Sequence, residues 1–228
     1  MPSLRGSGVN GNHINHIPEG VIERLPAYLG VLLQLRQEGD STVSSARLGE
    51  LTHINPAQIR RDLTHFGQFG KRGVGYDIAS LVEQVQRILG SDHAHRMVLV
   101  GAGNLGTAIA SYDGLKSRGF ALVAIFDKDP TRVGIRAGDM IVRDISELPR
   151  VVSEQNVRIG VIAVPHDAAQ EVTDLMVEHN IRVILNYSSA MVRAPAGVVV
   201  HNTDPVRELL HTLYYLSKSD AIAAVAVE

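Results

Sequence analysis

The 228-residue sequence contains no cysteine. This absence excludes disulfide bonds, thiolate zinc sites and thiol-based redox switches, so any redox response would have to come through a bound cofactor. The sequence also lacks an apolar run close to the roughly 18 residues that span a bilayer. Its N-terminal stretch lacks the apolar segment of a secretory signal. We therefore expect a cytoplasmic protein.

An excess of charge of one sign is also missing, since the formal net charge is −2. A nearly neutral chain is not a wholly basic nucleic-acid coat, although this total is compatible with a local basic patch. Hydrophobic residues make up 45% and charged residues 20%, which is typical of a globular protein. The length suffices for one large domain or two small ones.

Composition and periodicity divide the chain into four segments. We expect a disordered leader over 1–16, a helical domain over 17–90, a domain of alternating strands and helices over 91–203, and a helix with a tail over 204–228. The leader is rich in Gly, Asn and His and shows no sustained period. No third ligand accompanies its two histidines, so we predict no metal site there.

The segment from residue 17 has the period of helices. Apolar residues recur at three- and four-residue steps until Gly39, a residue expected just beyond a helix end. Pro26 marks a break or a fresh helix start within this stretch. Ser44 or Ser45 would then cap a second, short helix.

A third helix and a hairpin follow. Asn55 is the expected N-cap and Pro56 the first helical residue, and the helix runs to about Phe66. The stretch from Phe66 to Tyr76 has four glycines and two adjacent cations, which predicts a tight hairpin. Three helices followed by such a hairpin are the parts of a winged helix-turn-helix.

The third helix has a core side and a polar side. At 100° per residue, Ile59, Leu63 and Phe66 share one stripe that would face the core. The outward residues are Ala57, Gln58, Arg60, Arg61, Thr64 and His65. Between Asn55 and Tyr76, four cations stand against one carboxylate, a local excess that favours DNA binding. The alternative is a solvated amphipathic helix in a module that contacts only proteins.

Beyond residue 90 the pattern changes to short apolar runs separated by helices. The candidate strands are Met97–Val100, Ala121–Phe126, Met140–Val142, Ile159–Val164, Val183–Leu185 and Val198–Val200. Nearly continuous Val and Ile runs of this kind are typical of a parallel sheet buried on both faces.

A glycine motif follows the first of these strands. Gly101, Gly103 and Gly106 form a G-x-G-x-x-G that opens a helix predicted over Leu105–Arg118, and Asp127 lies 21 positions after Gly106. This is the spacing of a dinucleotide site, in which the acid binds the ribose hydroxyls. Asp127 would repel a 2′-phosphate and Lys128 would soften that repulsion, so NAD is favoured over NADP. The alternative is a glycine turn without a ligand.

Evidence for catalysis is thin. Tyr112 and Lys116 have the spacing of a reductase pair, but the predicted phosphate-binding helix is too early in the chain for that role, and Tyr112 is better placed near the cofactor. His166 and Asp167 follow a strand, where Asp167 would equally cap a helix. We therefore predict no catalytic residue. An NAD-dependent oxidoreductase with a helical appendage and a CoA- or nucleotide-binding module remain as alternatives.

The last predicted helix carries an apolar stripe from Val206 to Leu216 at three- and four-residue intervals. Such a stripe must be buried on its own sheet or on another subunit, and an exchanged terminal helix is a common route to a dimer.

Several strings together resemble the Rex family of redox-sensing transcriptional repressors. They are Ile17-Pro18, Arg24-Leu25-Pro26-Ala27-Tyr28, Val43-Ser44-Ser45-Ala46, Ile59-Arg60-Arg61-Asp62 with Phe66-Gly67, Gly70-Lys71-Arg72-Gly73-Val74-Gly75-Tyr76, Gly103-Asn104-Leu105-Gly106-Thr107-Ala108, Val164-Pro165 and Ile184-Leu185-Asn186. The resemblance covers about residues 17–217. The sequence departs from the family at Tyr187-Ser188-Ser189, where an aromatic–Thr–Pro string is usual, and at His166, where a small residue is common.

The resemblance implies a fold and a function. The fold is an N-terminal winged helix joined to a Rossmann-like parallel sheet, in a homodimer with exchanged C-terminal helices. The function is repression at inverted-repeat operator DNA near genes of fermentative or respiratory metabolism, with release when NADH binds and with NAD⁺ competing. It also implies that Arg24, Tyr112 and Asp204 link the nicotinamide pocket, the DNA-binding domain and the partner subunit.

Pattern and resemblance together give two sets of candidate site residues. The expected cofactor residues are Gly101, Gly103, Asn104, Leu105, Gly106, Tyr112, Asp127, Lys128, Val164, Pro165 and Tyr187. The expected DNA-binding residues are Ser44, Ser45, Ala57, Gln58, Arg60, Arg61, Thr64, His65, Lys71, Arg72 and Tyr76.

Overall fold

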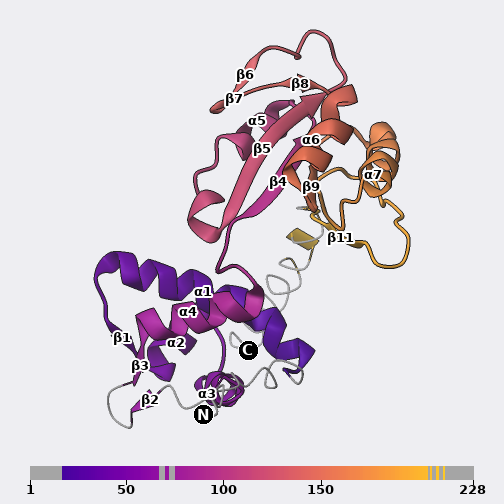
Figure 1. Cartoon of the computed structure of the whole chain (residues 1–228). Coiled ribbons are helices and arrows are strands. Elements are labelled where there is room, and N and C mark those ends of the chain that lie inside the picture. Colours follow the sequence, from indigo (N-terminus) through magenta and orange to yellow (C-terminus); the bar gives the residue numbers. More distant parts are fainter. Residues whose placement is uncertain are drawn as a thin grey trace, which may run out of the picture. The chain divides into compact units, whose positions relative to one another are not determined.

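The computed structural model describes residues 17–66, 70–71, 75–204, 206, 209–210 and 213. Two compact units make up the chain, Met1–His93 and Ala94–Glu228 (Figure 1). The predicted leader, 1–16, and the tail from residue 214 lie outside the described residues.

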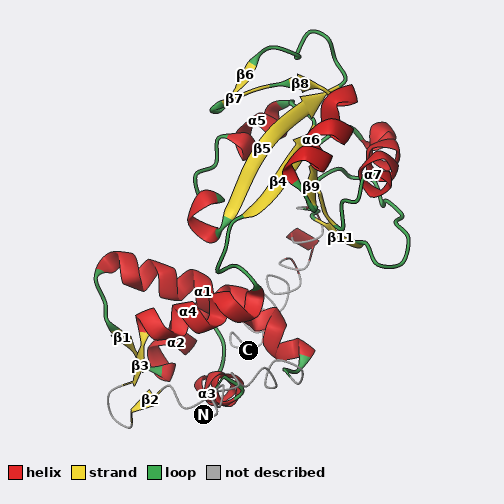
Figure 2. Ribbon diagram, viewed as in Figure 1, coloured by secondary structure: helices red, strands yellow, loops and turns green. Residues whose placement is uncertain are grey.

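The first unit is helical with a small sheet (Figure 2). Its elements are α1 (Glu19–Glu38), β1 (Thr42–Val43), α2 (Ser45–Thr52), α3 (Pro56–Thr64), β2 (Gly70–Lys71), β3 (Gly75–Asp77) and α4 (Ile78–Leu89). The hairpin strands β2 and β3 pair antiparallel, and β1 adds to β3 on the other side. Ser44 and Asn55 cap α2 and α3 as predicted, through side-chain oxygens that accept the N–H groups of Arg47 and Ala57.

Pro26 does not break the first helix, contrary to the sequence expectation. Helix α1 runs unbroken through it to a left-handed cap at Gly39. Pro26 lies on the exposed side, whereas Leu25, Tyr28 and Leu29 on the other side are buried in the core of the unit. Packing of that buried side therefore outweighs the hydrogen bond that proline removes.

Helices α2 and α3 meet closely at their turn. A side-chain carbon at Gly49 would lie only 2.6 Å from the carbonyl oxygen of Ile54, so the turn requires a glycine there. Ile59 and Leu63 of α3 are buried and Phe66 packs against the same core, which confirms the predicted core stripe.

The second unit alternates strands and helices. Its strands are β4 (His95–Val100), β5 (Phe120–Asp127), β6 (Arg136–Ala137), β7 (Met140–Ile141), β8 (Arg143–Asp144), β9 (Ile159–Ile162), β10 (Val183–Asn186) and β11 (Val199–Asn202). Its helices are α5 (Asn104–Ala110), η2 (Lys116–Arg118), η3 (Ile145–Glu147), α6 (Leu148–Gln155), η4 (His166–Ala168) and α7 (Ala169–Glu178).

Six of these strands form one sheet in the order β11-β10-β9-β4-β5-β8. Every pairing in it is parallel, which confirms the predicted sheet. One face packs against α6 and α7, which lie along it in Figure 1, and the other face packs against residues of α5. The strand order reverses direction at β4, so the carboxyl ends of β4 and β9 bound the crevice in which such sheets bind ligands.

Two predicted elements of this unit are wrong. The helix expected over Leu105–Arg118 ends at Ala110, because Ser111 turns its hydroxyl onto the carbonyl of Thr107 and Gly114 follows shortly after. The strand expected over Met140–Val142 belongs instead to a short antiparallel hairpin of β6 and β7, made possible by a left-handed Gly138. The sheet takes the next residues, β8, as its edge strand.

Four apolar side chains near the end of the described chain lie open to solvent. Val206, Leu209, Leu210 and Leu213 are helical, and between 54% and 64% of each is exposed. Their spacing is that of one face of a helix, which agrees with the predicted stripe.

Candidate functional site

The glycine turn joins β4 to α5 at the crevice of the sheet. Gly101 has a φ of +105° and donates its N–H to the carbonyl of Phe126 at 2.8 Å. A side-chain carbon at Gly101 would collide with the carbonyl of Ala163, and one at Gly106 would collide with the carbonyl of Gly101. Both positions therefore require glycine for close packing of turn, helix and neighbouring strand.

Asp127 ends β5 beside this turn. Its Oδ2 accepts the N–H of Ala102 at 2.7 Å, and its Oδ1 accepts the N–H of Asp129 at 3.0 Å. The side chain is only 13% exposed. Each carboxylate oxygen has a second lone pair, so the group can still accept hydrogen bonds from a ribose.

A cavity of about 470 Å³ opens between the turn and the loop after β9. Eight of the predicted cofactor residues line it: Gly101, Gly103, Asn104, Leu105, Asp127, Lys128, Val164 and Pro165. The size is that of a small-molecule site. The chemistry of a dinucleotide fits its lining, which combines a backbone turn open at Gly103, a carboxylate and an apolar wall.

The other three predicted cofactor residues do not line this cavity. Gly106 is buried in the turn, as its packing role requires. Tyr187 is half-buried against the sheet, and its N–H is bonded to the carbonyl of Ile162. Tyr112 is 57% exposed.

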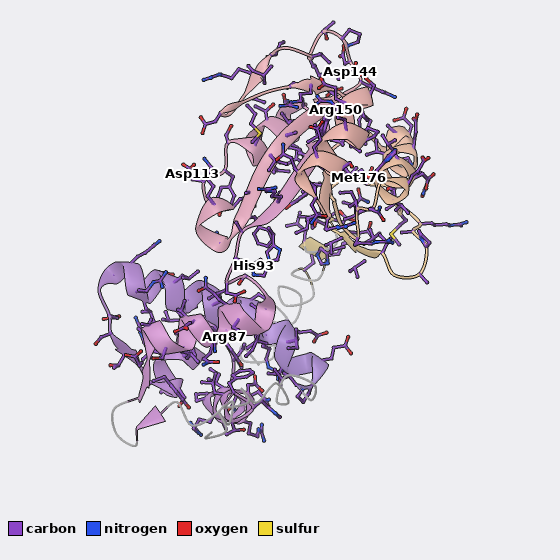
Figure 3. The ribbon with its side chains drawn as sticks, in the orientation of Figure 1. Arg87, His93, Asp113, Asp144, Arg150 and Met176 are labelled. Atoms are coloured by element: carbon purple, nitrogen blue, oxygen red, sulfur yellow. The ribbon has the colours of Figure 1, made fainter. Side chains whose placement is uncertain are left out.

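Tyr112 lies in the loop that replaces the end of the predicted helix, next to Asp113, which is labelled in Figure 3. Its ring folds over Gly114, and its hydroxyl accepts a hydrogen bond from Arg118 at 3.3 Å. Tyr112 therefore does not lie on the helix predicted over Leu105–Arg118, because α5 ends at Ala110.

Sequence reasoning missed other residues that line the cavity. They are Val100, Asp129, Arg132, Ile145, Ala163 and Val172. Among these six residues Arg132 is the cation, and the sequence indicated it only by its position, five residues after the predicted ribose-binding acid. The apolar members could not be separated from ordinary core residues by pattern.

His166 and Asp167 begin the turn η4 and are both exposed. Asp167 does not cap that turn, which starts after Pro165 without a side-chain hydrogen bond. The expectation of an N-cap is wrong, because the backbone around Pro165 already turns the chain.

Helix α3 presents the predicted polar side to solvent. Ala57, Arg60, Arg61, Thr64 and His65 are exposed, whereas Gln58 is half-buried. Arg60 of α3 donates a hydrogen bond to the hydroxyl of Ser45 of α2 at 3.0 Å. This bond joins the two helices of the helix-turn-helix. Arg61 donates to Gln58 at 2.7 Å.

The wing residues are described in part. Lys71 lies in β2 and Tyr76 in β3, where Tyr76 is half-buried against the core. Arg72 lies outside the described residues.

Asp62 of α3 is the one carboxylate in the local charge count of the sequence, and the sequence did not indicate whether it is buried. Its side chain is only 1% exposed. The Arg24 guanidinium donates two hydrogen bonds to the Asp62 carboxylate, from Nε to Oδ2 at 2.7 Å and from Nη2 to Oδ1 at 2.9 Å. Tyr28 adds a hydroxyl donor at 2.6 Å and Gln58 an amide donor at 2.7 Å. These hydrogen bonds join helix α1 to helix α3.

The network shifts the ionisation of its members. Burial alone would raise the pKa of Asp62, but the hydrogen bonds from Arg24, Tyr28 and Gln58 outweigh it and hold that pKa below its usual value. The pKa of Tyr28 is raised by burial and by its bond to the Asp62 carboxylate. The hydrogen bond to Asp62 raises the pKa of Arg24 further above its usual value.

The three predicted linking residues have partners within their own units. Arg24 is paired with Asp62, Tyr112 bonds with Arg118, and Asp204 accepts the N–H of Val206 at 2.9 Å. Across the residues described, there is no cluster of three or more metal-ligating His, Cys, Asp or Glu side chains and no helix that could cross a membrane.

Comparison with known proteins gives matches to both units. Residues 16–64 match the family model described as "Putative DNA-binding protein N-terminus", and residues 92–190 match the one described as "CoA binding domain". The redox-sensing transcriptional repressor Rex of Rubrobacter xylanophilus is 51% identical over 201 residues, which cover 88% of this chain and 93% of that protein.

Solved structures agree. RSP, a Rex-family repressor, has been solved in complex with β-NADH, at 31% identity and a TM-score of 0.80 over 92% of this chain and 98% of that one. Its complex with β-NAD⁺ and operator DNA has 32% identity and a TM-score of 0.80 over 94% and 99%. With such identity over nearly its whole length, this chain belongs to the Rex family of redox-sensing transcriptional repressors.

Proposed function

We propose that this chain is a cytoplasmic repressor that binds inverted-repeat operator DNA and is released when NADH binds, with NAD⁺ competing. The observation that carries the proposal is the cavity at the glycine turn with its anchored Asp127, in a member of a redox-sensing repressor family. Related RSP has been solved with each of the ligands that this function needs.

The first unit, which we assign to residues 17–90, supplies the DNA contacts. The exposed side of α3 carries two arginines, which suit guanine edges or phosphates in a major groove. We assign DNA contacts to the predicted set on α2, α3 and the wing, Ser44, Ser45, Ala57, Gln58, Arg60, Arg61, Thr64, His65, Lys71, Arg72 and Tyr76. Gln58 would have to leave Asp62 to reach a base, so it is the least free of these side chains.

The second unit, which we assign to residues 91–203, supplies the cofactor site. The turn at Gly101–Leu105, with Gly106 behind it, would hold the pyrophosphate. Asp127 and Lys128 would hold the adenosine ribose, and Val164–Pro165 would line the path to the nicotinamide. We also retain Tyr112 and Tyr187, which must approach the cavity when the cofactor is bound.

The dimer and the switch depend on residues 204–228. The exposed face of Val206, Leu209, Leu210 and Leu213 needs a cover, and the same helix of a partner subunit or the partner's sheet would supply one. NADH and NAD⁺ differ in ring planarity and charge, so a switch requires a subunit arrangement that binds one form better. We propose Arg24, Tyr112 and Asp204 as the residues that make one subunit arrangement bind NADH better than the other does.

The direct test is fluorescence anisotropy of an inverted-repeat operator titrated with the full chain, alone and with each dinucleotide. We expect NADH to release the DNA and excess NAD⁺ to oppose that release. Unchanged operator binding at saturating NADH would refute redox sensing.

A pair of arginine variants tests the DNA face in the same assay. Arg61→Ala should weaken operator binding about tenfold, because one bidentate base or phosphate contact is lost. Arg87→Ala is the matched control, since Arg87 pairs with Glu83 on α4. Equal losses in the two variants would contradict the assignment of α3.

The match to a CoA-binding family model favours a second candidate, CoA in the same cavity. CoA carries a ribose phosphate, which the carboxylates of Asp127 and Asp129 would repel. Calorimetric titration with CoA and with NADH distinguishes the two. Tighter binding of CoA than of NADH would identify CoA, and not NAD(H), as the ligand of this cavity.

A further inference from the structure

We propose that Arg132 is a dinucleotide-binding residue that exchanges its ion pairs with Asp127 and Asp129 for the cofactor pyrophosphate. The inference rests on the proposed NAD(H) site and adds to it a residue that the glycine motif does not contain. It concerns what holds the phosphates, whereas the proposed function concerns what binding does to DNA affinity.

The first observation is the position of the guanidinium over the turn. Gly103 has an ordinary backbone conformation, with φ −71° and ψ −168°, so its glycine is not needed for a left-handed turn. A side-chain carbon there would point at Arg132, 3.0 Å from Nη1. The face of Gly103 that must stay open for phosphate approach is thus the face on which Arg132 lies.

The second observation is that Arg132 is held loosely. Its Nη1 is 3.9 Å from Oδ2 of Asp127, and its Nε is 3.6 Å from Oδ2 of Asp129. Both distances exceed hydrogen-bond length, and the side chain is 44% exposed. The pair with Asp129 is exposed on both sides and contributes little, and the contact with the largely buried Asp127 is longer than a hydrogen bond, so the arginine can leave both at small cost.

Asp127 does not need this arginine to stay in place. Its short bonds come from the backbone N–H groups of Ala102 and Asp129. When Arg132 moves away, the carboxylate keeps its position and gains room for ribose hydroxyls. The same movement of Arg132 therefore frees the Asp127 carboxylate for the ribose and brings the guanidinium to the pyrophosphate.

The third observation is the charge around the cavity. Asp127 and Asp129 are two carboxylates beside the place where a doubly charged pyrophosphate would bind, and Lys128 and Arg132 are the cations that line the same cavity. Without Arg132 the local charge would oppose the ligand. A guanidinium also matches a phosphate through two parallel hydrogen bonds, which a lysine cannot supply.

The experiment measures binding of defined ligands to the full-length protein and its variants by calorimetry. NADH, ADP-ribose and NADPH are titrated into wild type, Arg132→Ala and Arg132→Lys. Adenosine, which has no phosphate, is followed by NMR. Arg150→Ala is the matched control, because Arg150 lies on α6 with Glu147 and Glu154 as partners (Figure 3).

We expect Arg132→Ala to weaken NADH and ADP-ribose alike, by about tenfold to a hundredfold, as for a lost hydrogen bond between charged groups. Adenosine binding should not change, Arg132→Lys should recover part of the loss, and Arg150→Ala should bind as wild type does. The dependence of affinity on salt should be shallower in Arg132→Ala, because one charge contact is gone.

Three results would overturn the inference. Unchanged NADH affinity would show that Arg132 does not touch the pyrophosphate. A loss confined to NADPH would assign Arg132 to the ribose 2′ position instead. An equal loss for adenosine would indicate damage to the turn. If wild type itself failed to bind NADH, the proposed function would fail, which is a separate outcome.

Discussion

Asp62 illustrates what single residues contribute to the first unit. Its carboxylate is buried on α3, and two of its partners, Arg24 and Tyr28, lie 38 and 34 positions earlier in the chain. Removing one member of such a network leaves the other polar groups buried without a partner, which costs more than the net value of the bonds.

We predict that Asp62→Asn lowers the free energy of unfolding of the first unit by about 2–4 kcal/mol, because Arg24 loses its ionic partner. The chain holds no tryptophan, so urea unfolding is followed by circular dichroism. Glu83→Gln, which removes a carboxylate from an exposed pair on α4, should unfold as wild type does. Equal stability of the two variants would contradict the network's role.

The same network predicts how stability depends on pH. The folded pKa of Asp62 is below its unfolded value, so its contribution is complete above about pH 4 and is lost as the pH falls through the folded pKa. The folded pKa of Tyr28 is raised, so its contribution is complete below about pH 10 and is lost as the pH rises further.

Differences between variants isolate these two groups from the other carboxylates. Below pH 4 the gap in stability between wild type and Asp62→Asn should shrink. Above pH 10 the gap between wild type and Tyr28→Phe should shrink. Gaps that stay constant over both ranges would refute the assigned ionisation.

At the scale of elements, the glycine turn contains glycines that the fold itself requires and one, Gly103, that we propose is needed for the approach of the ligand. Gly106 packs against the carbonyl of Gly101, with no space for a side chain. Gly103 meets only the end of the flexible Arg132 side chain. Glycine is thus needed for different reasons at two positions of one motif: backbone packing at Gly106, and an unobstructed approach at Gly103.

We predict that Gly103→Ala folds as wild type does but loses at least tenfold in NADH affinity, because the added methyl group blocks phosphate approach. Gly106→Ala should instead destabilise the whole second unit through its backbone collision. Thermal unfolding by circular dichroism and NADH calorimetry distinguish them. Normal NADH affinity in Gly103→Ala would place the phosphates elsewhere.

The sequence predicted elements well where one periodicity dominated. The buried strands beside Gly101 and Asp127, the helix caps at Ser44 and Asn55, and the core stripe of α3 followed from local patterns. The end of α5, the hairpin before β8 and the burial of Asp62 did not, because competing local bonds or distant partners decide them. Arg132 was missed for the same reason, since its position over Gly103 depends on tertiary packing.

At the scale of the whole molecule, the apolar side chains of Val206, Leu209, Leu210 and Leu213 are left exposed in the described part of a single chain. Apolar residues exposed side by side are usually covered in the functional assembly. Two recognition helices held by a dimer would also match the two halves of an inverted repeat.

We predict that Leu209→Glu combined with Leu213→Glu converts the proposed dimer to a monomer in analytical ultracentrifugation and weakens operator binding at least tenfold. Each unit should remain folded, because these side chains are exposed in the single chain. Glu208→Lys, which changes charge in the same segment, serves as the control. A doubly substituted protein that stays dimeric would locate the interface elsewhere.

The anchoring of Asp127 has a consequence for how cofactor preference can evolve in this lineage. The carboxylate that we propose binds the ribose also accepts the N–H of Ala102, so it would fix the backbone of the turn as well as select the cofactor. Replacing it to admit a phosphorylated cofactor would loosen the turn at the same time. A viable change of cofactor preference would therefore begin in the neighbouring loop, at Lys128 or Arg132. Substitutions there leave the hydrogen bond from Ala102 to Asp127 in place.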